Sequence, residues 1–407
     1  MSDASSSQHL GLLFTAFEPS GDDHAAAVIA ELRRRHPDLP IYAWGGPKME
    51  RAGATIIERT GDEAVMGMPG LAKLIEHQRI NTRINRWLRE GKAKVHVPVD
   101  SPGANFPICK LTRRAGLKIV HLVAPQVWAW APWRIRKLRR LTDLVLCLLP
   151  FEEPWFMQRA VPAKFIGHPL FDGSGEEAGL DARAAAIGLE GSPKVAFMPG
   201  SRPGEFRACF PVLLDAFKRL RKDFPTAAGV VAATRPEVAM VLRGLADLHG
   251  GWPPGLEMVC GDTDAVIRWC DYALVTSGTV TLQIARQRKP MAAFYRPSKF
   301  MYHLIGRWLV TTPMFTLPNL IAGKRVIPEL IPYFSDSGED LAVEVIKFMR
   351  RTGYADDQRE ALQRVVRAFE GKHAATSAAD QIERIAGLVA PAVEPGAAPI
   401  DLVPARA

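Results

Sequence analysis

The chain has 407 residues, of which 47% are hydrophobic and 23% are charged. This is an ordinary globular composition, which excludes a disordered chain, and the length predicts two domains. The 52 Lys and Arg residues outnumber the 43 Asp and Glu residues, for a formal net charge of +9. That balance favours an anionic partner such as phosphate, nucleic acid or an acidic membrane face.

The five cysteines are scattered and show no metal-ligand spacing. They predict reduced thiols in a cytoplasmic protein, and we expect no metal site and no cofactor. The N-terminal stretch MSDASSSQHL lacks the features of a secretory signal. The apolar runs, such as DLVLCLLPF, are too short to span a bilayer.

Short apolar runs alternate with helical patterns, which is typical of βαβ units and parallel sheets. Strands are predicted at 9–16, 41–46, 117–124, 143–150, 163–169, 194–200, 227–234, 272–278 and 291–295. Helical patterns occupy 21–37, 338–352 and 357–388. The predicted fold class is α/β, with two doubly wound parallel sheets facing a cleft and ligands beyond the carboxyl ends of the strands.

The domain boundaries follow from changes in composition. A segment rich in glycine, alanine and charge interrupts the strand pattern and predicts a connection between domains. We place the first domain at 9–172, the connection at 173–193, the second domain at 194–335 and C-terminal helices at 336–389, with disordered ends at 1–8 and 390–407.

Two strand-to-helix turns contain residues suited to ligand binding. In EPSGDD, Gly21 would let the backbone approach a ligand and Ser20 would cap the following helix, with Glu18 just before it. In MPGSRPGEF, Arg202 can present its guanidinium group to a phosphate. Each turn alone fits a well-capped tight turn equally well.

A third turn, VTSGTVTLQ, places Ser277, Gly278 and Thr279 at the start of a predicted helix, where backbone N–H groups bind anions. Neither a Walker A loop nor a GxGxxG fingerprint is present. Two such turns in the second half of the chain favour a ligand that carries a diphosphate.

Three weaker signals have ordinary structural interpretations. Asp262 in the DTD triplet resembles a metal-binding motif, but it precedes a helical pattern and predicts a helix cap. His121 and His168 lie on apolar strands and predict hydrogen-bonded core histidines.

The stretch VAPQVWAWAPWRIRKLRR contains three tryptophans and then five basic side chains. Taken alone, it fits nucleic acid, a membrane surface, an anionic small ligand, or a core segment followed by a solvated helix.

The motifs EPSGD, GGPKM, AVMGMPG, VAPQVWAW, LPFE, FIGHP, PGSRPGE, SGTVTLQ and LPNLIAG occur in an order that resembles the lipid-A-disaccharide synthase family, from about residue 12 to about 335. The resemblance implies a GT-B glycosyltransferase with two Rossmann-like domains. It implies transfer from UDP-2,3-diacylglucosamine to 2,3-diacylglucosamine 1-phosphate, with inversion, release of UDP and no metal. The first half would bind the acceptor and the second half the UDP-sugar.

The family's essential aspartate corresponds to Asp100 in VPVDSPGANF, where it would take the proton of the acceptor hydroxyl. This segment departs from the family pattern, because Gly103 and Ala104 replace a second aspartate.

On the donor side, the family normally has glutamate where Gln283 stands, and Gln can accept through one oxygen only. The resemblance implies donor-side roles for Ser201, Arg202, Glu205, Ser277, Gly278, Thr279, Gln283 and Asn319. It implies acceptor-side roles for Glu18, Ser20, Gly21, Trp128 and Trp130.

An apolar segment followed by an amphipathic helix suggests how such an enzyme would reach lipid substrates. Its residues Met66, Met68, Leu71, Leu74 and Ile75 would contact the inner membrane peripherally, or the helix simply packs on its own domain. We expect no nucleic acid partner, and a homodimer is left open.

Two alternatives remain. One is a sugar-nucleotide isomerase resembling UDP-GlcNAc 2-epimerase, which needs no acyl pocket. The other is a non-catalytic relative that binds UDP-sugar or lipid, suggested by the altered DSPGANF segment and by Gln283.

Overall fold

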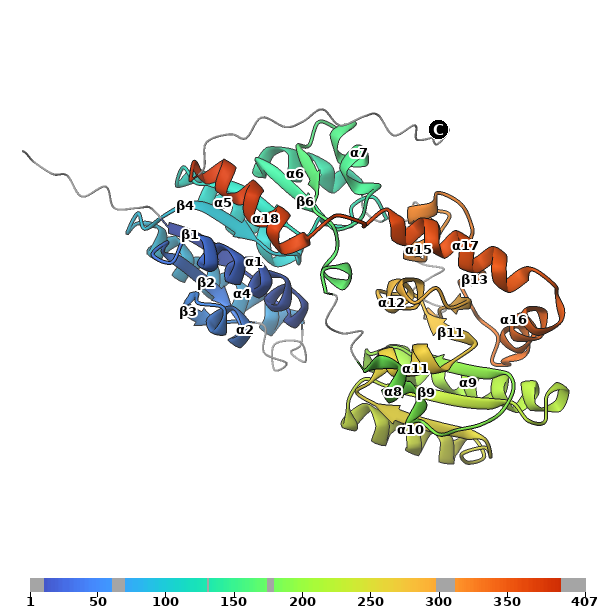
Figure 1. Ribbon diagram of the computed structural model, residues 1–407. Helices are drawn as coiled ribbons and strands as arrows, with labels where there is room; N and C mark the ends of the chain where they lie inside the picture. Colours follow the sequence, from blue (N-terminus) through green and yellow to red (C-terminus); the bar gives the residue numbers. More distant parts are fainter. Residues whose placement is uncertain (1–10, 61–69, 130–131, 174–178, 298–311, 389–407) are drawn as a thin grey trace, which may run out of the picture. The chain divides into compact units, whose positions relative to one another are not determined.

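The computed structural model describes residues 11–60, 70–129, 132–173, 179–297 and 312–388. They form two compact units, which are drawn in Figure 1. Unit 1 contains the described residues up to Val123, residues 141–145 and those from Ala375 on. Unit 2 contains residues 124–140 and 146–374.

In the first part of the chain, parallel strands alternate with helices, as the sequence predicted. The order is β1 (Gly11–Thr15), α1 (Pro19–Arg35), β2 (Ile41–Gly45), α2 (Pro47–Arg51), β3 (Thr55–Arg59), α4 (Gly70–Leu88), β4 (Ala93–Pro98), α5 (Pro102–Arg114) and β5 (Lys118–Leu122). Next come η1 (Pro132–Arg134), α6 (Ile135–Leu141), β6 (Leu144–Cys147), α7 (Glu152–Met157), β7 (Ala163–Phe165) and η2 (Pro169–Phe171).

These strands form a sheet with the order β3-β2-β1-β4-β5-β6-β7. Strand β1 pairs in parallel with β2 on one side and with β4 on the other, with Thr15 opposite Trp44 and Pro98. Because the carboxyl ends of parallel strands meet at one edge, the turns after β1, β4 and β5 lie together.

The core of unit 1 is built from the apolar strands and from helix α4. Trp44 on β2 is buried and packs edge-to-face against Trp87 of α4, with ring centroids 5.5 Å apart. Ile80 and Ile84, one helical turn apart on α4, belong to the same cluster. Burial of each such side chain stabilises the fold by about 1.5–3 kcal/mol.

The last helix, α18 (Ala374–Ala386), returns to unit 1 and lies beside α1 (Figure 1). Arg35 at the end of α1 donates to Glu383 at 2.9 Å, and His36 Nε2 lies 2.8 Å from the same carboxylate. The C-terminal end of the described chain is therefore an integral part of the first unit.

Unit 2 carries the second parallel sheet, with the strand order β10-β9-β8-β11-β12-β13. Its elements are α8 (Leu180–Ala185), β8 (Lys194–Met198), α9 (Pro203–Asp223), β9 (Ala228–Ala233), α10 (Pro236–Leu248), β10 (Leu256–Cys260), α11 (Thr263–Trp269), β11 (Tyr272–Thr276) and α12 (Val280–Arg286). They continue with β12 (Met291–Phe294), α15 (Leu317–Ala322), β13 (Glu329–Leu330), α16 (Glu339–Arg350) and α17 (Tyr354–Arg367).

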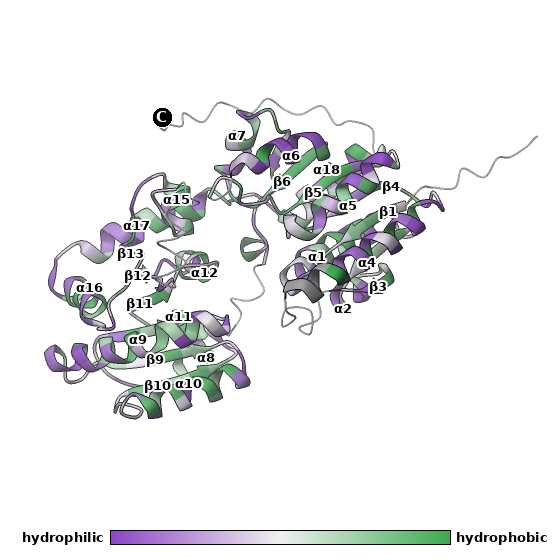
Figure 2. Ribbon diagram, turned by 180° about the vertical axis from the view of Figure 1, so that it is seen from behind, coloured by the Kyte–Doolittle hydropathy of each residue, from purple (hydrophilic) through white to green (hydrophobic). Residues whose placement is uncertain are grey.

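Hydrophobic residues concentrate in the strands, and the surrounding helices carry hydrophilic sections, as Figure 2 shows. Strands β8, β9, β11 and β12 are almost wholly buried, whereas α9 buries one apolar face that includes Phe206, Phe210 and Phe217. The predicted α/β class with two parallel sheets is confirmed.

One local prediction in unit 1 is wrong. Helix α1 begins at Pro19 and its N-cap is Glu18, so Ser20 lies inside the first turn and caps nothing. Proline is well suited to the first helical position because its φ angle is preset and it has no N–H to satisfy. The helix therefore starts earlier than a serine cap would place it.

Candidate functional site

A cavity of 660 Å³ opens in unit 2 at the carboxyl ends of β8 and β11. Residues 312–320, which lead into α15, supply another part of its wall through Thr312, Met314 and Phe315. Most of the predicted donor-side residues line it, namely Ser201, Arg202, Glu205, Ser277, Gly278, Thr279 and Gln283. The structure thus brings together two turns that are about 75 residues apart in the chain.

The turn after β8 is held by Glu205. Its Oε1 atom lies 2.9 Å from Arg202 NH1, and its carboxylate caps helix α9 from the third helical position. Gly200 adopts a φ angle of +100°, and an added Cβ would lie 2.9 Å from Glu205 Oε2. Only glycine fits this position without strain.

Arg202 is the cation of this turn. Its side chain is 81% exposed, and it lies in the cavity wall at the start of the 21-residue helix α9. An exposed ion pair such as Arg202–Glu205 contributes about 0–1 kcal/mol, so the guanidinium group can turn toward an anionic ligand at small cost.

The turn after β11 presents backbone donors. The N–H groups of Gly278 and Thr279 donate to no atom of the described protein. An added Cβ on Gly278 would meet nothing within 4 Å, so the space beside this turn is open. Ser277 is already occupied, because its hydroxyl donates to the carbonyl of Phe315 at 2.7 Å.

Asn319 does not line the cavity, although the resemblance implied a donor-side role. Its side chain is fully buried; Nδ2 donates to the carbonyl of Ile327, and Oδ1 accepts from the N–H groups of Val326 and Ile327. Its neighbours on α15, Leu317 and Leu320, face the cavity instead. Asn319 therefore holds α15 against residues 326–327, which lie just before β13.

Glu329, which sequence reasoning passed over, fixes the same wall. Its Oε1 atom accepts from the N–H groups of Phe315 and Thr316 at 3.0 and 2.7 Å and from the Thr316 hydroxyl at 2.6 Å. A half-buried carboxylate with such partners orders the loop that faces the ligand space.

Trp128 also lines this cavity, whereas the resemblance implied the acceptor side. Its indole N–H donates to Glu152 Oε1 at 3.0 Å, and its ring packs edge-to-face on Phe151, with centroids 4.9 Å apart. Glu152 Oε2 accepts from the N–H of Leu149 at 3.0 Å. Burial raises the pKa of Glu152 to about 7, so this carboxyl titrates near neutral pH.

In unit 1, Asp100 follows directly after β4. Its N–H donates to the carbonyl of Leu122, and its φ angle is +47°. Ser101 and Val123 also have positive φ angles, so strained non-glycine backbone is concentrated at this sheet edge. Such strain is typical of functional sites.

The environment of Asp100 favours a proton acceptor. Burial raises the pKa of its carboxyl, and the negative charge of Glu18, at the end of the β1 turn, raises it further. A carboxylate with a raised pKa is a better general base than an ordinary surface aspartate.

The β1 turn itself has a structural explanation that the sequence did not reveal. An added Cβ on Gly21 would lie 3.3 Å from Ala16 Cβ, so this glycine lets α1 pack closely on the residue that follows β1. The next residue, Asp22, is buried and accepts from the N–H groups of Gly46, Lys48 and Met49. EPSGD and GGPKM are thus two halves of one helix-capping contact.

The remaining predictions have mixed outcomes. Asp262 accepts from the N–H of Ala265 and caps α11, as predicted, and His168 Nδ1 accepts from the N–H of Leu170. His121 is a buried core residue, as predicted; neither ring nitrogen makes a hydrogen bond of ordinary distance and angle among the described residues, although the backbone of Leu122 and Val123 interacts with the ring. Burial lowers its pKa to about 4.

The expected membrane segment falls largely outside the described residues. Met66, Met68 and Trp130 are not described, and Leu71 and Leu74 are described only as backbone of α4. Ile75 is 51% exposed. In the described part of the chain, no helix has the length and apolar character needed to span a bilayer, and no three His, Cys, Asp or Glu side chains gather as metal ligands.

The fold has clear counterparts among solved structures. The chain is similar to the Staphylococcus aureus MnaA–UDP co-structure, with a TM-score of 0.61 and 12% identity over 93% of this chain and 98% of that one. It is similar to Anabaena Alr3699/HepE in complex with UDP and glucose, with a TM-score of 0.55 and 13% identity over 94% of this chain and 100% of that one. The protein therefore has the GT-B fold.

The sequence comparisons narrow this class. Residues 12–383 match the family model described as lipid-A-disaccharide synthetase. Lipid-A-disaccharide synthase of Geobacter sulfurreducens is 31% identical over 87% of this chain and 91% of its own length, and that of Pseudomonas putida is 34% identical over 90% and 96%. The chain belongs to the lipid-A-disaccharide synthase family and is a hexosyltransferase of lipid A biosynthesis.

Proposed function

We propose that the protein transfers diacylglucosamine from UDP-2,3-diacylglucosamine to 2,3-diacylglucosamine 1-phosphate with inversion, giving the disaccharide 1-phosphate and UDP. The observation that carries this proposal is the cavity of unit 2, in which the exposed Arg202 and two backbone N–H groups without an acceptor among the described residues line one space. Family membership supports the same reaction.

On the donor side, Arg202 binds the diphosphate, and the N–H groups of Gly278 and Thr279 donate to its oxygens. These contacts strengthen as charge develops on the leaving UDP, so they stabilise the transition state more than the ground state. Gln283 lies in the same cavity wall and offers one carbonyl oxygen to a ligand hydroxyl.

On the acceptor side, Asp100 takes the proton of the attacking hydroxyl. The acceptor oxygen forms a bond to the anomeric carbon while the bond from that carbon to the diphosphate oxygen breaks. The proton moves to the Asp100 carboxylate, and UDP leaves with the bonding electron pair. A positioned base of this kind contributes roughly 10²–10⁴-fold to the rate.

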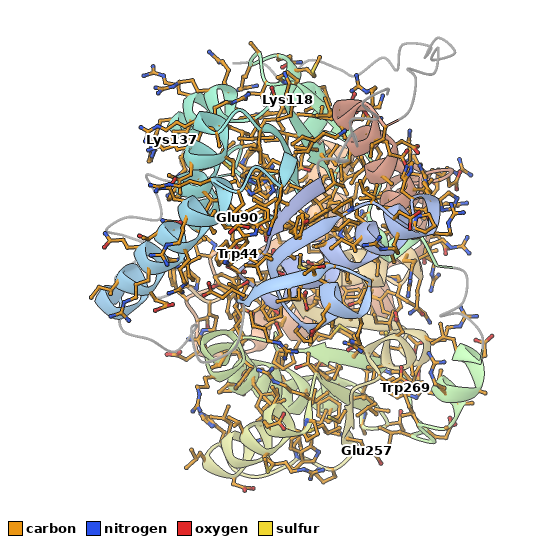
Figure 3. All side chains as sticks on the ribbon, turned by 90° about the vertical axis from the view of Figure 1, so that its left-hand side faces the viewer. Trp44, Glu90, Lys118, Lys137, Glu257 and Trp269 are labelled. Atoms are coloured by element: carbon orange, nitrogen blue, oxygen red, sulfur yellow. The ribbon has the colours of Figure 1, made fainter. Side chains whose placement is uncertain are left out.

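The lipid substrates suggest peripheral binding to an anionic membrane. Exposed Ile75 on α4 supplies apolar surface, and exposed Arg136, Lys137 and Arg140 on α6 supply positive charge. Lys137 projects outward from α6 in Figure 3. Sedimentation with vesicles of anionic and of neutral lipid tests this; binding to neither kind would contradict it.

The experiment that tests the activity is direct. Purified protein is mixed with both substrates in detergent micelles, with a chelator present, and the products are identified by mass spectrometry. We expect the disaccharide 1-phosphate and UDP in equal amounts. Epimerised UDP-sugar formed without acceptor would favour the isomerase, and UDP binding without turnover would favour the non-catalytic relative.

A further inference from the structure

A chain of buried hydrogen bonds leads from the interior of unit 1 to the loop that carries Asp100. Thr15 on β1, His96 on β4 and Asn105 on α5 are all fully buried. Thr15 Oγ1 lies 2.8 Å from His96 Nε2 and 2.7 Å from Asn105 Oδ1. Asn105 Nδ2 then donates to the carbonyl oxygens of Val99 and Asp100, each at 2.9 Å.

The direction of every bond in this chain follows from the number of protons available. The Asn105 amide uses its N–H groups on Val99 and Asp100, so its oxygen must accept the single hydroxyl proton of Thr15. Thr15 must therefore accept from His96, which carries its proton on Nε2.

The other side of the imidazole is also satisfied. Burial lowers the pKa of His96 to about 3, so the ring is neutral and its Nδ1 atom is an acceptor. Thr112 Oγ1 lies 2.9 Å from Nδ1 and can donate to it, with the carbonyl oxygen of Ile108 at 3.2 Å as its other acceptor. From His96 through Thr15 to Asn105, the chain has one consistent set of donors and acceptors, and such a buried, fully paired network is rigid.

The loop at the end of this chain needs such support. Asp100 and Ser101 have φ angles of +47° and +37°, a conformation that is unfavourable for non-glycine residues. The side chain of Asn105 donates to the two carbonyl groups that precede Ser101. Its backbone N–H donates to the Ser101 carbonyl at 3.0 Å.

We propose that Thr15, His96 and Asn105 are positioning residues that fix the direction of the Asp100 carboxylate by holding this strained loop. The inference rests on the proposed function, in which Asp100 accepts the proton. None of the three residues is proposed to touch substrate. A displacement of about 1 Å at a reacting group costs on the order of 10²-fold in rate.

The test compares Thr15→Val with Thr15→Ser. Valine has nearly the same volume but no hydroxyl, so it interrupts the chain, whereas serine retains it. We expect Thr15→Val to lower kcat roughly 10–100-fold, with the KM for UDP-sugar and the Kd for UDP unchanged. Thr15→Ser should restore most of the lost kcat.

A matched control separates positioning from general destabilisation. Thr60 is another buried threonine of unit 1, and its hydroxyl donates to the carbonyl of Ala16 at 2.6 Å. Thr60→Val therefore removes a similar bond outside the chain, and kcat should stay close to that of the wild type. An equal loss of kcat in Thr60→Val and Thr15→Val would overturn the inference.

Hydrogen exchange gives a readout that does not depend on turnover. We expect faster amide exchange at residues 99–105 in Thr15→Val than in wild type, and no such change in Thr60→Val. If the wild type makes no disaccharide, the proposed function fails, whereas unchanged exchange in Thr15→Val overturns the positioning role. If Thr15→Val does not fold, Thr112→Val at the far end of the chain is expected to speed exchange in the same segment, and unchanged exchange there would overturn the role.

Discussion

In unit 1, the backbone after β4 is strained and is held by buried side chains whose hydrogen bonds are all internal. In unit 2, the turns after β8 and β11 border a cavity, Arg202 is exposed, and two backbone donors have no acceptor in the described part of the chain. The first edge is held by protein side chains, although Ser101 Oγ and both ring nitrogens of His121 are buried without a partner among the described residues. The second edge borders a cavity. This contrast suggests that unit 1 supplies fixed chemistry and unit 2 supplies adaptable binding.

The largest effect is expected from removal of the proposed base, Asp100. Asp100→Asn retains the size of the side chain but cannot accept the proton, and we expect kcat to fall roughly 10²–10⁴-fold. The Kd for UDP, measured by calorimetry, should stay unchanged because we propose that the nucleotide binds in unit 2. A large loss of UDP affinity together with normal kcat would reverse the two roles.

Removal of the Arg202 side chain tests nucleotide binding in the cavity of unit 2. Arg202→Ala eliminates a charge-assisted contact worth about 1.5–3 kcal/mol, so UDP should bind roughly 10–100-fold more weakly. Arg207→Ala is the matched control, because Arg207 is an exposed arginine on the same helix that does not line the cavity. Equal effects of the two variants would indicate a nonspecific contribution of charge.

A substitution at Gly200 tests whether the turn after β8 in unit 2 is rigid. Gly200→Ala introduces a Cβ atom at a positive φ angle and against Glu205, and we expect a loss of about 1–3 kcal/mol in the free energy of unfolding. Urea denaturation measures it. Gly204→Ala, where nothing lies within 4 Å of the added Cβ, is the control and should be close to neutral.

Glu152 adds a pH dependence to unit 2. Its folded pKa of about 7 exceeds the ordinary value of 4.5, so the native state binds this proton more tightly than the unfolded state. The contribution of Glu152 to stability is therefore favourable at low pH and is lost as pH rises from about 4.5 to about 7. The stability of Glu152→Gln relative to wild type should increase across this window in thermal melts; a difference that does not vary with pH would contradict the assignment.

The smallest expected effect concerns Glu18. Its charge helps to raise the pKa of Asp100, so Glu18→Gln should lower that pKa. Because activity requires the ionised Asp100, the acidic limb of the kcat/KM profile should move to lower pH. A shift to higher pH, or none, would show that the two carboxylates do not interact.

The sequence was sufficient for the fold and for most of the cavity. Apolar runs with turn signals identify parallel strands, and GSRPGE and SGTVT follow β8 and β11, so both were predicted to lie at one sheet edge. Glu329 and Glu152 were missed as supports of the cavity wall, because a carboxylate far along the chain gives no local signal of its partners.

The chain of buried hydrogen bonds in unit 1 could not be predicted from the sequence either. Thr15 and His96 each lie within an apolar strand pattern, where alternation predicts burial but not a polar partner 81 residues away. Asn105 resembled a helix residue, yet its amide faces the strand ends. Strain at Asp100 could not be predicted either, because neither Asp100 nor Ser101 is a glycine.

Amide hydrogen exchange with and without UDP most directly tests whether unit 2 binds the nucleotide while unit 1 supplies the base. We expect UDP to slow amide exchange at residues 200–206 and 277–283, with the greatest change at Gly278 and Thr279. We expect residues 98–105 to be protected already in the absence of UDP. Protection by UDP at 98–105, with none at 277–283, would contradict the central claim that the nucleotide binds in unit 2.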